Sequence, residues 1–202
     1  SIPYDQTWFE LYDVMTDLSD LEIQAEELEA NNFVGVAKIL KALNLSIVVD
    51  MWGDVPYSEA FFAQTLTPAY DDDQALYQTI QTLLDEGIVA LETGDSPVSL
   101  GDEDLFFGGD EAAWVKTAYA LKARLYLHTG DLGDALTALG NGFDSNADDA
   151  QLVYFETENN PWANVAINNS NLLLGGWISE QLVEAMDGTT FGVVDPRMPF
   201  MF

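Results

Sequence analysis

Cysteine is absent from the 202 residues of this chain. Its absence excludes disulfide bonds, thiolate catalysis and cysteine-ligated zinc within this stretch. His128 is the only histidine, so the paired histidines of a zinc protease helix are excluded as well. The GxSxG sequence of a serine nucleophile elbow does not occur either. These absences leave little support for a catalytic protein.

Basic residues are scarce. Six lysines and arginines stand against 35 aspartates and glutamates, which gives a formal net charge of −29. Binding to nucleic acid or to an anionic lipid surface requires a basic patch, so neither is expected as a partner. The acids are spread along the chain, and their mutual repulsion weakens as salt rises. We therefore expect adaptation to a saline setting.

Long hydrophobic runs are also missing. No run approaches the roughly 20 apolar residues that a membrane-spanning helix needs. The first five residues lack the basic and apolar segments of a signal peptide. The protein is therefore either cytosolic or begins here downstream of a processed leader. Hydrophobic residues still make up 48% of the chain, enough to build a core.

Helical periodicity is the dominant pattern that is present. Apolar residues recur with the i, i+3, i+4, i+7 spacing of an amphipathic helix. Six segments show this spacing: residues 8–28, 33–52, 76–91, 114–125, 132–139 and 177–186. Asp110 precedes one of them and is a good N-cap, because its carboxylate can accept hydrogen bonds from the first backbone amides. The sequence thus predicts an all-α protein.

Glycine–aspartate pairs occur at the ends of three of these segments, at residues 53–54, 94–95 and 130–131. Glycine adopts the left-handed conformation that ends a helix, and aspartate can cap the next segment. The spacing is typical of helical-hairpin repeats, and residues 119–139 fit the tetratricopeptide pattern. In this pattern the small residues Ala123 and Ala135 let the paired helices approach, and the large residues Tyr119, Tyr126 and Leu139 fill the groove between them. We expect tetratricopeptide-like hairpins joined by long irregular loops at residues 100–110 and 141–171.

The stretch MWGDVPYSEAF, residues 51–61, crowds aromatic side chains around a Gly-Asp-Val-Pro turn. Pro56 fixes its own backbone and favours an extended Val55, while Gly53 supplies the turn. Trp52 and Tyr57 then offer apolar area to hold a helix pair against its neighbour. We interpret this stretch as a structural corner and regard a binding site here as the weaker alternative.

The segment TENNPWANV, residues 157–165, combines an aromatic ring with amides in a loop. Sugar binding needs a ring to stack on the pyranose face and polar groups to pair its hydroxyls, because unpaired buried hydroxyls cost about 1–3 kcal/mol each. The alternative is that the tryptophan fills the core and the asparagines form turns. The predicted ligand-binding residues are Trp162, Asn160, Asn159, Asn164 and Tyr154.

Acidic clusters at residues 71–73 and 101–111 contain the hard oxygen ligands that calcium prefers. Neither has the EF-hand spacing, and aspartates at a helix N-terminus are favoured by the helix dipole alone. We expect no cofactor beyond, at most, a weakly bound calcium ion. With 35 acids, a suitable carboxylate pair for a glycosidase always exists, so that signal carries almost no weight.

Five motifs together resemble one family. They occur in the order MWGDVPYSEAF, PAYDDDQALYQTIQTLLDEGIVAL, DLFFGGDEAAWVKTAYALKARLYLHTGD, NNPW and DPRMPF, across most of residues 33–200. This order is similar to that of the SusD/RagB-type, or SusD-like, surface lipoproteins. The resemblance implies an all-helical tetratricopeptide-like fold that binds glycans without cleaving them. It also implies an outer-membrane lipid anchor and a TonB-dependent, SusC-like barrel transporter that receives the oligosaccharide.

The chain departs from that family at its ends. It has no lipid-bearing cysteine, and it stops soon after residues 195–197, where family members continue. We therefore expect residues 1–202 to form a single SusD-like helical domain that is a fragment of a longer chain lacking both ends. The membrane contact would then come only from a lipid anchor outside this segment. A helical-repeat adaptor for peptides and an acidic glycoside hydrolase remain alternatives.

Overall fold

The computed structural model describes residues 4–61, 65–94, 96–101, 103–154, 160, 161, 163 and 180–196. The chain divides into two compact units, Ser1–Leu152 and Val153–Phe202, and each is described by itself. The expectation of a single domain over residues 1–202 stays a prediction.

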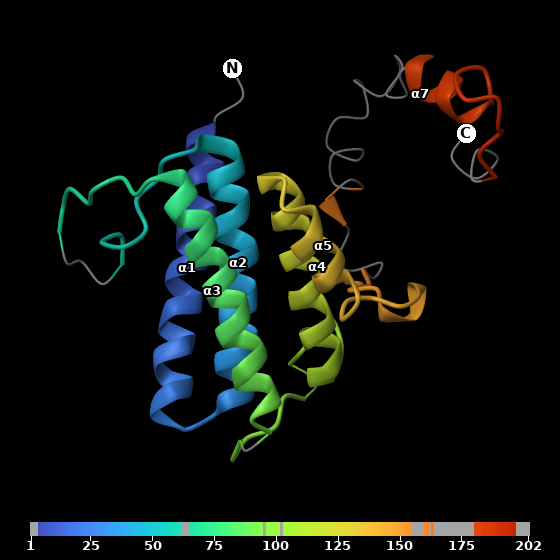
Figure 1. The fold of residues 1–202 in the computed structure, drawn as a ribbon. Coiled ribbons are helices and arrows are strands. Elements are labelled where there is room, and N and C mark those ends of the chain that lie inside the picture. Colours follow the sequence, from blue (N-terminus) through green and yellow to red (C-terminus); the bar gives the residue numbers. More distant parts are fainter. Residues whose placement is uncertain are drawn as a thin grey trace. The chain divides into compact units, whose positions relative to one another are not determined.

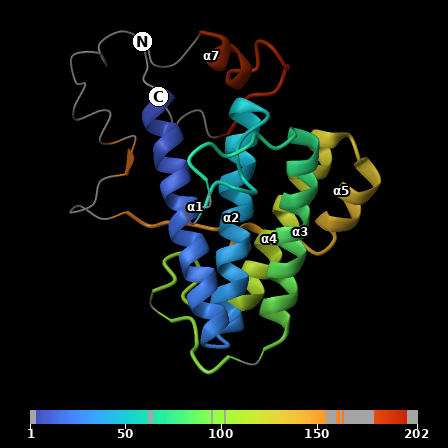
Figure 2. The same cartoon turned by 90° about the vertical axis from the view of Figure 1, so that its left-hand side faces the viewer.

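The described residues of the first unit form five α-helices and one short 3-10 helix. They are α1 (Tyr4–Glu27), α2 (Asn31–Trp52), α3 (Asp73–Glu92), α4 (Glu111–Thr129), α5 (Leu132–Leu139) and η1 (Asn146–Asp148). The all-α prediction is confirmed, and each helix expected in this unit is present. Consecutive helices from α1 to α4 run antiparallel to one another (Figures 1 and 2).

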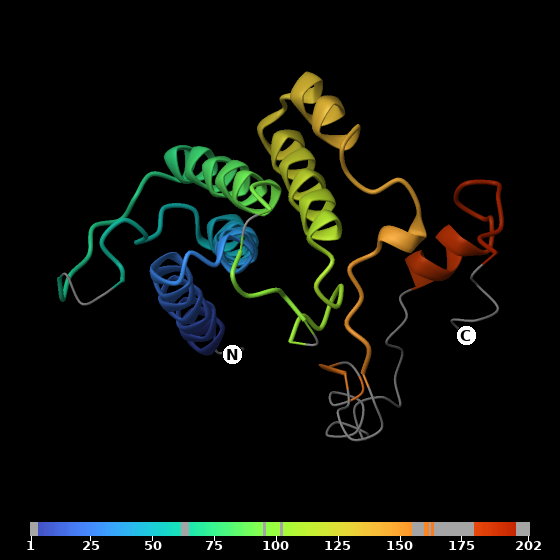
Figure 3. The same ribbon diagram turned by 90° about the horizontal axis from the view of Figure 1, so that it is seen from below.

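Helix α2 lies at the centre of the core. It packs against α1 and α3, and α3 in turn packs against α4 (Figure 3). Gly35 and Gly87 let α2 and α3 approach closely, because a Cβ atom on Gly35 would lie 2.8 Å from the Gly87 carbonyl oxygen. Leu45 of α2 and Ile80 of α3 are completely buried in the core. The apolar residues that show helical periodicity in the sequence are therefore residues of the core.

Within the described residues, α2 is the one helix long and apolar enough to cross a membrane by length and composition. No such run was expected from the sequence, because Lys38 and Lys41 interrupt it. Both lysines pair with the Glu22 carboxylate of α1, at 2.7 and 2.6 Å. In addition, 67% of the apolar window is buried inside the structure. These contacts are those of a core helix.

Helices α4 and α5 form the hairpin that the sequence predicts at residues 119–139. The two helices pack against each other, and Ala123 and Ala135 are buried, as expected for the small positions of a tetratricopeptide hairpin. The expectation that Leu139 fills a groove is wrong, because its side chain is exposed. Leu132 and Leu136 are exposed as well. In the described part of the chain, α5 packs through its alanines and leaves its leucines uncovered.

The described part of the second unit contains helix α7 (Glu180–Met186) and the turns after it. Met186 is buried, and its carbonyl oxygen accepts a hydrogen bond of 2.7 Å from the Asp195 amide. This contact folds residues 187–195 back onto the end of the helix. The last predicted helix is thus present over residues 180–186.

Candidate ligand-binding site

The aromatic stretch at residues 51–61 is part of the core. Trp52 lies edge-on to Trp8 of α1, with 5.1 Å between ring centroids. Phe61 contacts the Tyr57 ring at 5.7 Å and is 9% exposed. Val55 is completely buried. The interpretation of this stretch as a structural corner is confirmed.

The side chains of Tyr12 and Asp71 make four hydrogen bonds to this corner. The Tyr12 hydroxyl donates to the Pro56 carbonyl oxygen at 2.6 Å. The Asp71 carboxylate accepts from the Tyr57 and Ser58 amides at 2.8 and 2.9 Å, and from the Ser58 hydroxyl at 2.7 Å. Partial burial acts to raise the pKa of Asp71, but these hydrogen bonds outweigh it and lower the pKa. The polar groups of the corner therefore already bond to one another.

The loop at residues 103–110 is organised by Asp104. Its carboxylate accepts from the Trp114 indole at 2.8 Å and from the Gly109 and Phe106 amides at 3.0 Å each. Burial opposes ionisation, yet these hydrogen bonds lower the pKa of Asp104. Asp110 caps α4 as expected, accepting from the Ala112 amide at 3.0 Å. These aspartates serve the backbone of their own loop, and the calcium expectation stays a prediction.

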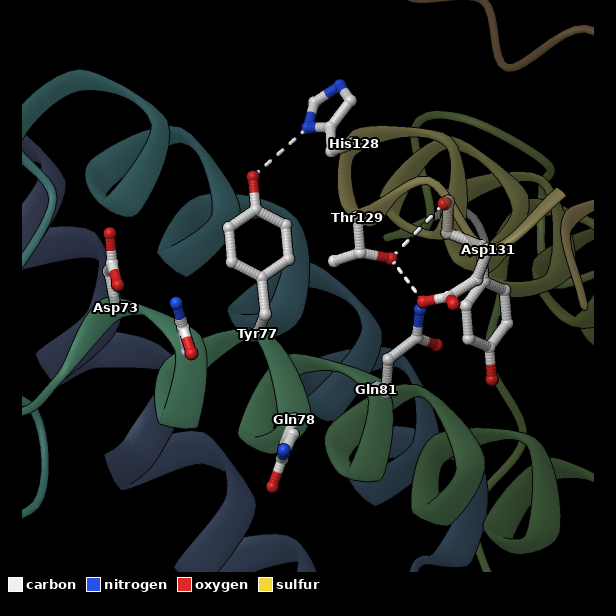
Figure 4. Close-up of a pocket in the computed structure, with 9 residues that line it drawn as sticks. Asp73, Tyr77, Gln78, Gln81, His128, Thr129 and Asp131 are labelled. Atoms are coloured by element: carbon white, nitrogen blue, oxygen red, sulfur yellow. Dashed lines mark hydrogen bonds between the residues drawn. The ribbon is translucent and has the colours of Figure 1, made fainter.

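A pocket of about 640 Å³ opens between α3 and the turn that joins α4 to α5. Tyr77 and Gln81 project from α3 toward this turn, which carries Thr129 and Asp131 (Figure 4). The residues that line it are Asp73, Gln74, Tyr77, Gln78, Gln81, Tyr126, His128, Thr129 and Asp131. The lining thus combines two tyrosines with amides and carboxylates.

A polar cluster holds Tyr77 at one side of the pocket. Its hydroxyl donates to the Asp50 carboxylate at 2.5 Å and lies 3.1 Å from His128 Nδ1. Arg124 approaches the same carboxylate at 3.7 Å. Burial and the hydrogen bond to Asp50 raise the pKa of Tyr77 to about 12. The ring is therefore fixed by α2 and α4 together, as a neutral phenol.

Gln81 and Tyr126 form the other side of the pocket. The Gln81 Nε2 group donates to the Lys122 carbonyl oxygen at 3.3 Å, while its Oε1 atom is buried and has no hydrogen-bond partner among the described residues. Lys122 pairs with Asp85 at 2.5 Å and lies 5.8 Å from the centroid of the Tyr126 ring. A buried acceptor without a donor costs free energy, so the Gln81 side-chain oxygen is a locally unfavourable feature of this side of the pocket.

The turn between α4 and α5 sets the position of Asp131. Gly130 has a φ of +84° and ends α4 in the left-handed conformation, as predicted. The Asp131 side chain makes no cap hydrogen bond to α5. Instead, its carboxylate accepts from the Thr129 hydroxyl at 2.6 Å. A carboxylate that the sequence assigns to capping thus faces the pocket.

Negative charge also gathers at the start of α3. The carboxylates of Asp54, Asp72 and Asp73 lie within 4.8 Å of one another. Asp72 caps α3 through the Ala75 amide at 3.0 Å, and Asp54 accepts from the Asp73 amide at 3.0 Å. The helix dipole favours these acids, as the sequence indicates. Asp73 is also one of the residues that line the pocket.

Each lysine and arginine in the described ranges pairs with a carboxylate. The pairs are Lys38 and Lys41 with Glu22, Lys116 with Asp144 and Asp148, Lys122 with Asp85, and Arg124 with Asp50. The few cations of these ranges are therefore already engaged within the protein.

The predicted sugar-binding residues belong to the second unit. Trp162, Asn159 and Asn164 lie outside the described residues. The Asn160 side-chain oxygen accepts from the Ala163 amide at 2.7 Å, the turn role that the sequence left open as an alternative. Tyr154 is 43% exposed. The structure does not test these five residues as a ligand site, and they stay a prediction.

The pocket was not predicted from the sequence as a ligand site, although Asp73 belongs to the acidic cluster at residues 71–73. Asp73, Tyr77 and Gln81 are four residues apart and form one polar stripe along α3, a signal that the apolar periodicity concealed. Tyr126 was predicted only as a packing residue of the hairpin, and His128 was considered only as the single histidine of the chain. Their convergence depends on the packing of α3 against α4, which no local pattern reveals.

Comparisons with solved structures show the same fold. A SusD/RagB family protein from Bacteroides thetaiotaomicron matches with a TM-score of 0.76 and 24% identity, over 83% of this chain and 37% of that one. A chitin-binding protein matches with a TM-score of 0.78 and 28% identity, over 95% of this chain and 41% of that one. A chitin-binding SusD homologue from Flavobacterium johnsoniae matches with a TM-score of 0.68 and 23% identity, over 79% of this chain and 35% of that one.

The chain spans 35–41% of the length of these three structures. A search of curated proteins gave no match. A family model described as "starch-binding associating with outer membrane" matches residues 3–202. With nearly the whole chain matched and the helical fold shared, this chain belongs to the SusD-like family.

Proposed function

We propose that this chain is a glycan-binding part of an outer-membrane nutrient-uptake protein. The observation that carries the proposal is the family match over residues 3–202, whose description names both starch binding and the outer membrane. The chitin-binding structure that covers 95% of this chain at 28% identity supports the same class of ligand. The ligand is accordingly an oligosaccharide or polysaccharide.

The proposed mechanism is capture without cleavage. An aromatic ring stacks on the apolar face of a sugar, and amide groups pair with its hydroxyls. Trp162 is the proposed ring, with Asn159, Asn160 and Asn164 as the amides and Tyr154 as an exposed neighbour. Affinity for a short oligosaccharide is expected to be weak, because these contacts replace hydrogen bonds to water. Several attachment points along a polymer raise the effective affinity.

The proposed partner is a TonB-dependent, SusC-like barrel transporter that receives the captured glycan. The proposed location is the cell surface, reached through a lipid anchor outside this segment. Both proposals rest on the family to which the chain belongs. The net charge of −29 disfavours binding to nucleic acid and attachment to an anionic membrane through basic residues.

A panel of insoluble polysaccharides and peptides tests this function. Purified protein is incubated with starch, chitin, other polysaccharides and immobilised peptides, and both retention and released products are measured. We expect retention on at least one polysaccharide with no product released. Retention on peptides alone would favour the helical-repeat adaptor, and soluble sugar products would establish a hydrolase. Either outcome contradicts the proposal.

Trp162→Ala tests the proposed stacking ring. We expect a loss of glycan retention of about tenfold, since one stacked aromatic contributes on the order of 1–2 kcal/mol. Phe9→Ala is the matched control, because Phe9 is an exposed aromatic on α1. Circular dichroism checks that helical content is unchanged in both variants. Equal retention by the two variants would show that Trp162 is not the platform.

A further inference from the structure

We propose that the pocket between α3 and the α4–α5 turn is a saccharide subsite for a sugar that carries a protonated amine, such as a glucosamine unit. The inference rests on the proposed glycan-binding function and adds a ligand class to it. The described residues that line this pocket all belong to the first unit.

The charge of the lining is the first argument. Two carboxylates, those of Asp73 and Asp131, contribute to it, and the lining contains no lysine or arginine among the described residues. The two lie on opposite sides of the pocket (Figure 4). The carboxylates of Asp54 and Asp72 beside Asp73 add further negative charge. Such a site repels phosphate and carboxylate ligands and attracts an ammonium group.

The nearby cations do not neutralise this charge. Arg124 lies 3.7 Å from the Asp50 carboxylate, and Lys122 pairs with Asp85 at 2.5 Å. Burial raises the pKa of Tyr126, and the charges of Asp134, Asp85 and Asp131 raise it further. Carboxylates thus act on the Tyr126 hydroxyl, while the Lys122 ammonium lies 5.8 Å from the centroid of its ring.

The hydrogen-bonding pattern is the second argument. The Gln81 Nε2 group already donates to the Lys122 carbonyl oxygen at 3.3 Å, so the carboxylates of Asp73 and Asp131 are the acceptors that the lining offers to a donor. The Asp131 carboxylate is fixed by the Thr129 hydroxyl at 2.6 Å and is not used to cap α5. An ammonium group offers three donors and no acceptor. An amine-bearing sugar thus matches the groups that the pocket presents.

The size and the rings of the pocket favour a sugar over a bare cation. Asp73, Tyr77 and Gln81 extend along two turns of α3, which is about 12 Å. The volume of about 640 Å³ lies in the range of pockets that take small organic ligands. Tyr77 and Tyr126 supply aromatic rings of the kind that stack on the C–H face of a pyranose. A metal ion alone would leave most of this space unfilled.

Isothermal titration calorimetry with three tetrasaccharides tests the proposal. The probes are the oligomers of glucosamine, of N-acetylglucosamine and of glucose. They are titrated at low and high salt in a mildly acidic buffer, in which the sugar amine is protonated and aspartate side chains remain ionised. We expect the glucosamine oligomer to bind at least threefold tighter than the N-acetylated one at low salt. That preference should shrink at molar salt, because exposed ion pairs are screened.

Asp73→Asn with Asp131→Asn tests the two carboxylates. We expect this double variant to weaken glucosamine-oligomer binding by about fivefold to tenfold and to leave glucose-oligomer binding within about twofold. Asp17→Asn with Asp20→Asn is the matched control, since both residues are exposed on α1 and their replacement removes the same charge outside the pocket. The control is expected to bind all three oligomers as the parent does.

Three results would overturn the inference. The first is equal affinity for the three oligomers, and the second is unchanged glucosamine binding in the double variant. The third is equally tight binding of a lysine tetrapeptide, which would show that the sugar is not what the pocket recognises. In the first two cases the proposed function stands as long as a neutral glycan still binds. Failure of every glycan to bind would contradict both proposals.

Discussion

Two turns of this chain begin with the same Gly-Asp pair, but one leads into the core and the other borders an open pocket. Gly53-Asp54 comes after α2 and leads into buried aromatic residues, whereas Gly130-Asp131 comes after α4 and borders an open polar pocket. The next residue in the first turn is Val55, which is completely buried, and in the second Leu132, which is exposed. A Gly-Asp pair therefore ends a helix in both places, and the residues after it decide whether a core or a site results.

The backbone differs between the two turns as well. Gly130 has a ψ of 9°, within the left-handed helical region, while Gly53 has a φ of 75° with a ψ of −122°, outside it. Asparagine and aspartate tolerate the left-handed region, but few residues other than glycine adopt the conformation of Gly53. The corner at Gly53 therefore depends on glycine more strictly than the turn at Gly130.

Phe61→Ala and Leu136→Ala give the largest expected contrast between the two regions. Phe61 is 9% exposed and Leu136 is 71% exposed. We expect Phe61→Ala to lower the free energy of unfolding by about 3 kcal/mol, because it removes a buried ring. Leu136→Ala should change it by less than about 0.5 kcal/mol. Chemical denaturation measures both, and similar losses in the two variants would contradict the assignment of core and surface.

Gly53→Asn and Gly130→Asn sharpen the backbone comparison. We expect Gly53→Asn to cost about 2 kcal/mol of unfolding free energy and Gly130→Asn less than about 1 kcal/mol, because only the latter position suits asparagine. Thermal denaturation ranks the two variants directly. A larger loss for Gly130→Asn would mean that the corner at Gly53 is not the stricter of the two turns.

Acid should weaken the Gly53 corner through Asp71. Its folded-state pKa is lowered by hydrogen bonds from Ser58 and Tyr57, so the stability it contributes is present above the ordinary carboxylate pKa of about 4. That contribution is lost as pH falls through the folded-state pKa. Asp71→Asn should therefore unfold with a shallower pH dependence below a pH of about 5. An identical slope in the parent and the variant would show that Asp71 contributes nothing.

Salt is expected to have the smallest and least local effect. The net charge of −29 destabilises the compact state by repulsion, which salt screens, so the melting temperature should rise from dilute buffer to molar salt. The stability difference between Phe61→Ala and Leu136→Ala should persist, because it depends mainly on burial. A melting temperature independent of salt would contradict the inference of a saline setting.

Sequence patterns were sufficient for the helices and for the corner. The apolar period places α2 and α3 within a few residues of their observed bounds, and Gly53 with Pro56 identifies the turn. These features are local, since they depend on residues close in the chain. The family resemblance rested on the same motifs and is confirmed by the match over residues 3–202.

The pocket lay beyond the reach of sequence patterns. Tyr77 and Tyr126 are far apart in the chain and meet only because α3 packs against α4. The exposure of Leu139 was also missed, because periodicity identifies an apolar face but does not show whether a neighbour covers it. The prediction that Trp162 binds glycan rests on the sequence alone, because this residue lies outside the described residues.

Hydrogen exchange of the glycan-bound protein tests the contrast between corner and site most directly. Backbone amide exchange is measured by mass spectrometry with and without a saturating glucosamine oligosaccharide. We expect slower exchange on ligand binding at residues 73–81 and 126–132, and no change at residues 53–61. Ligand-dependent protection concentrated at residues 53–61 would contradict this contrast, because the ligand would then occupy the stretch that forms part of the core.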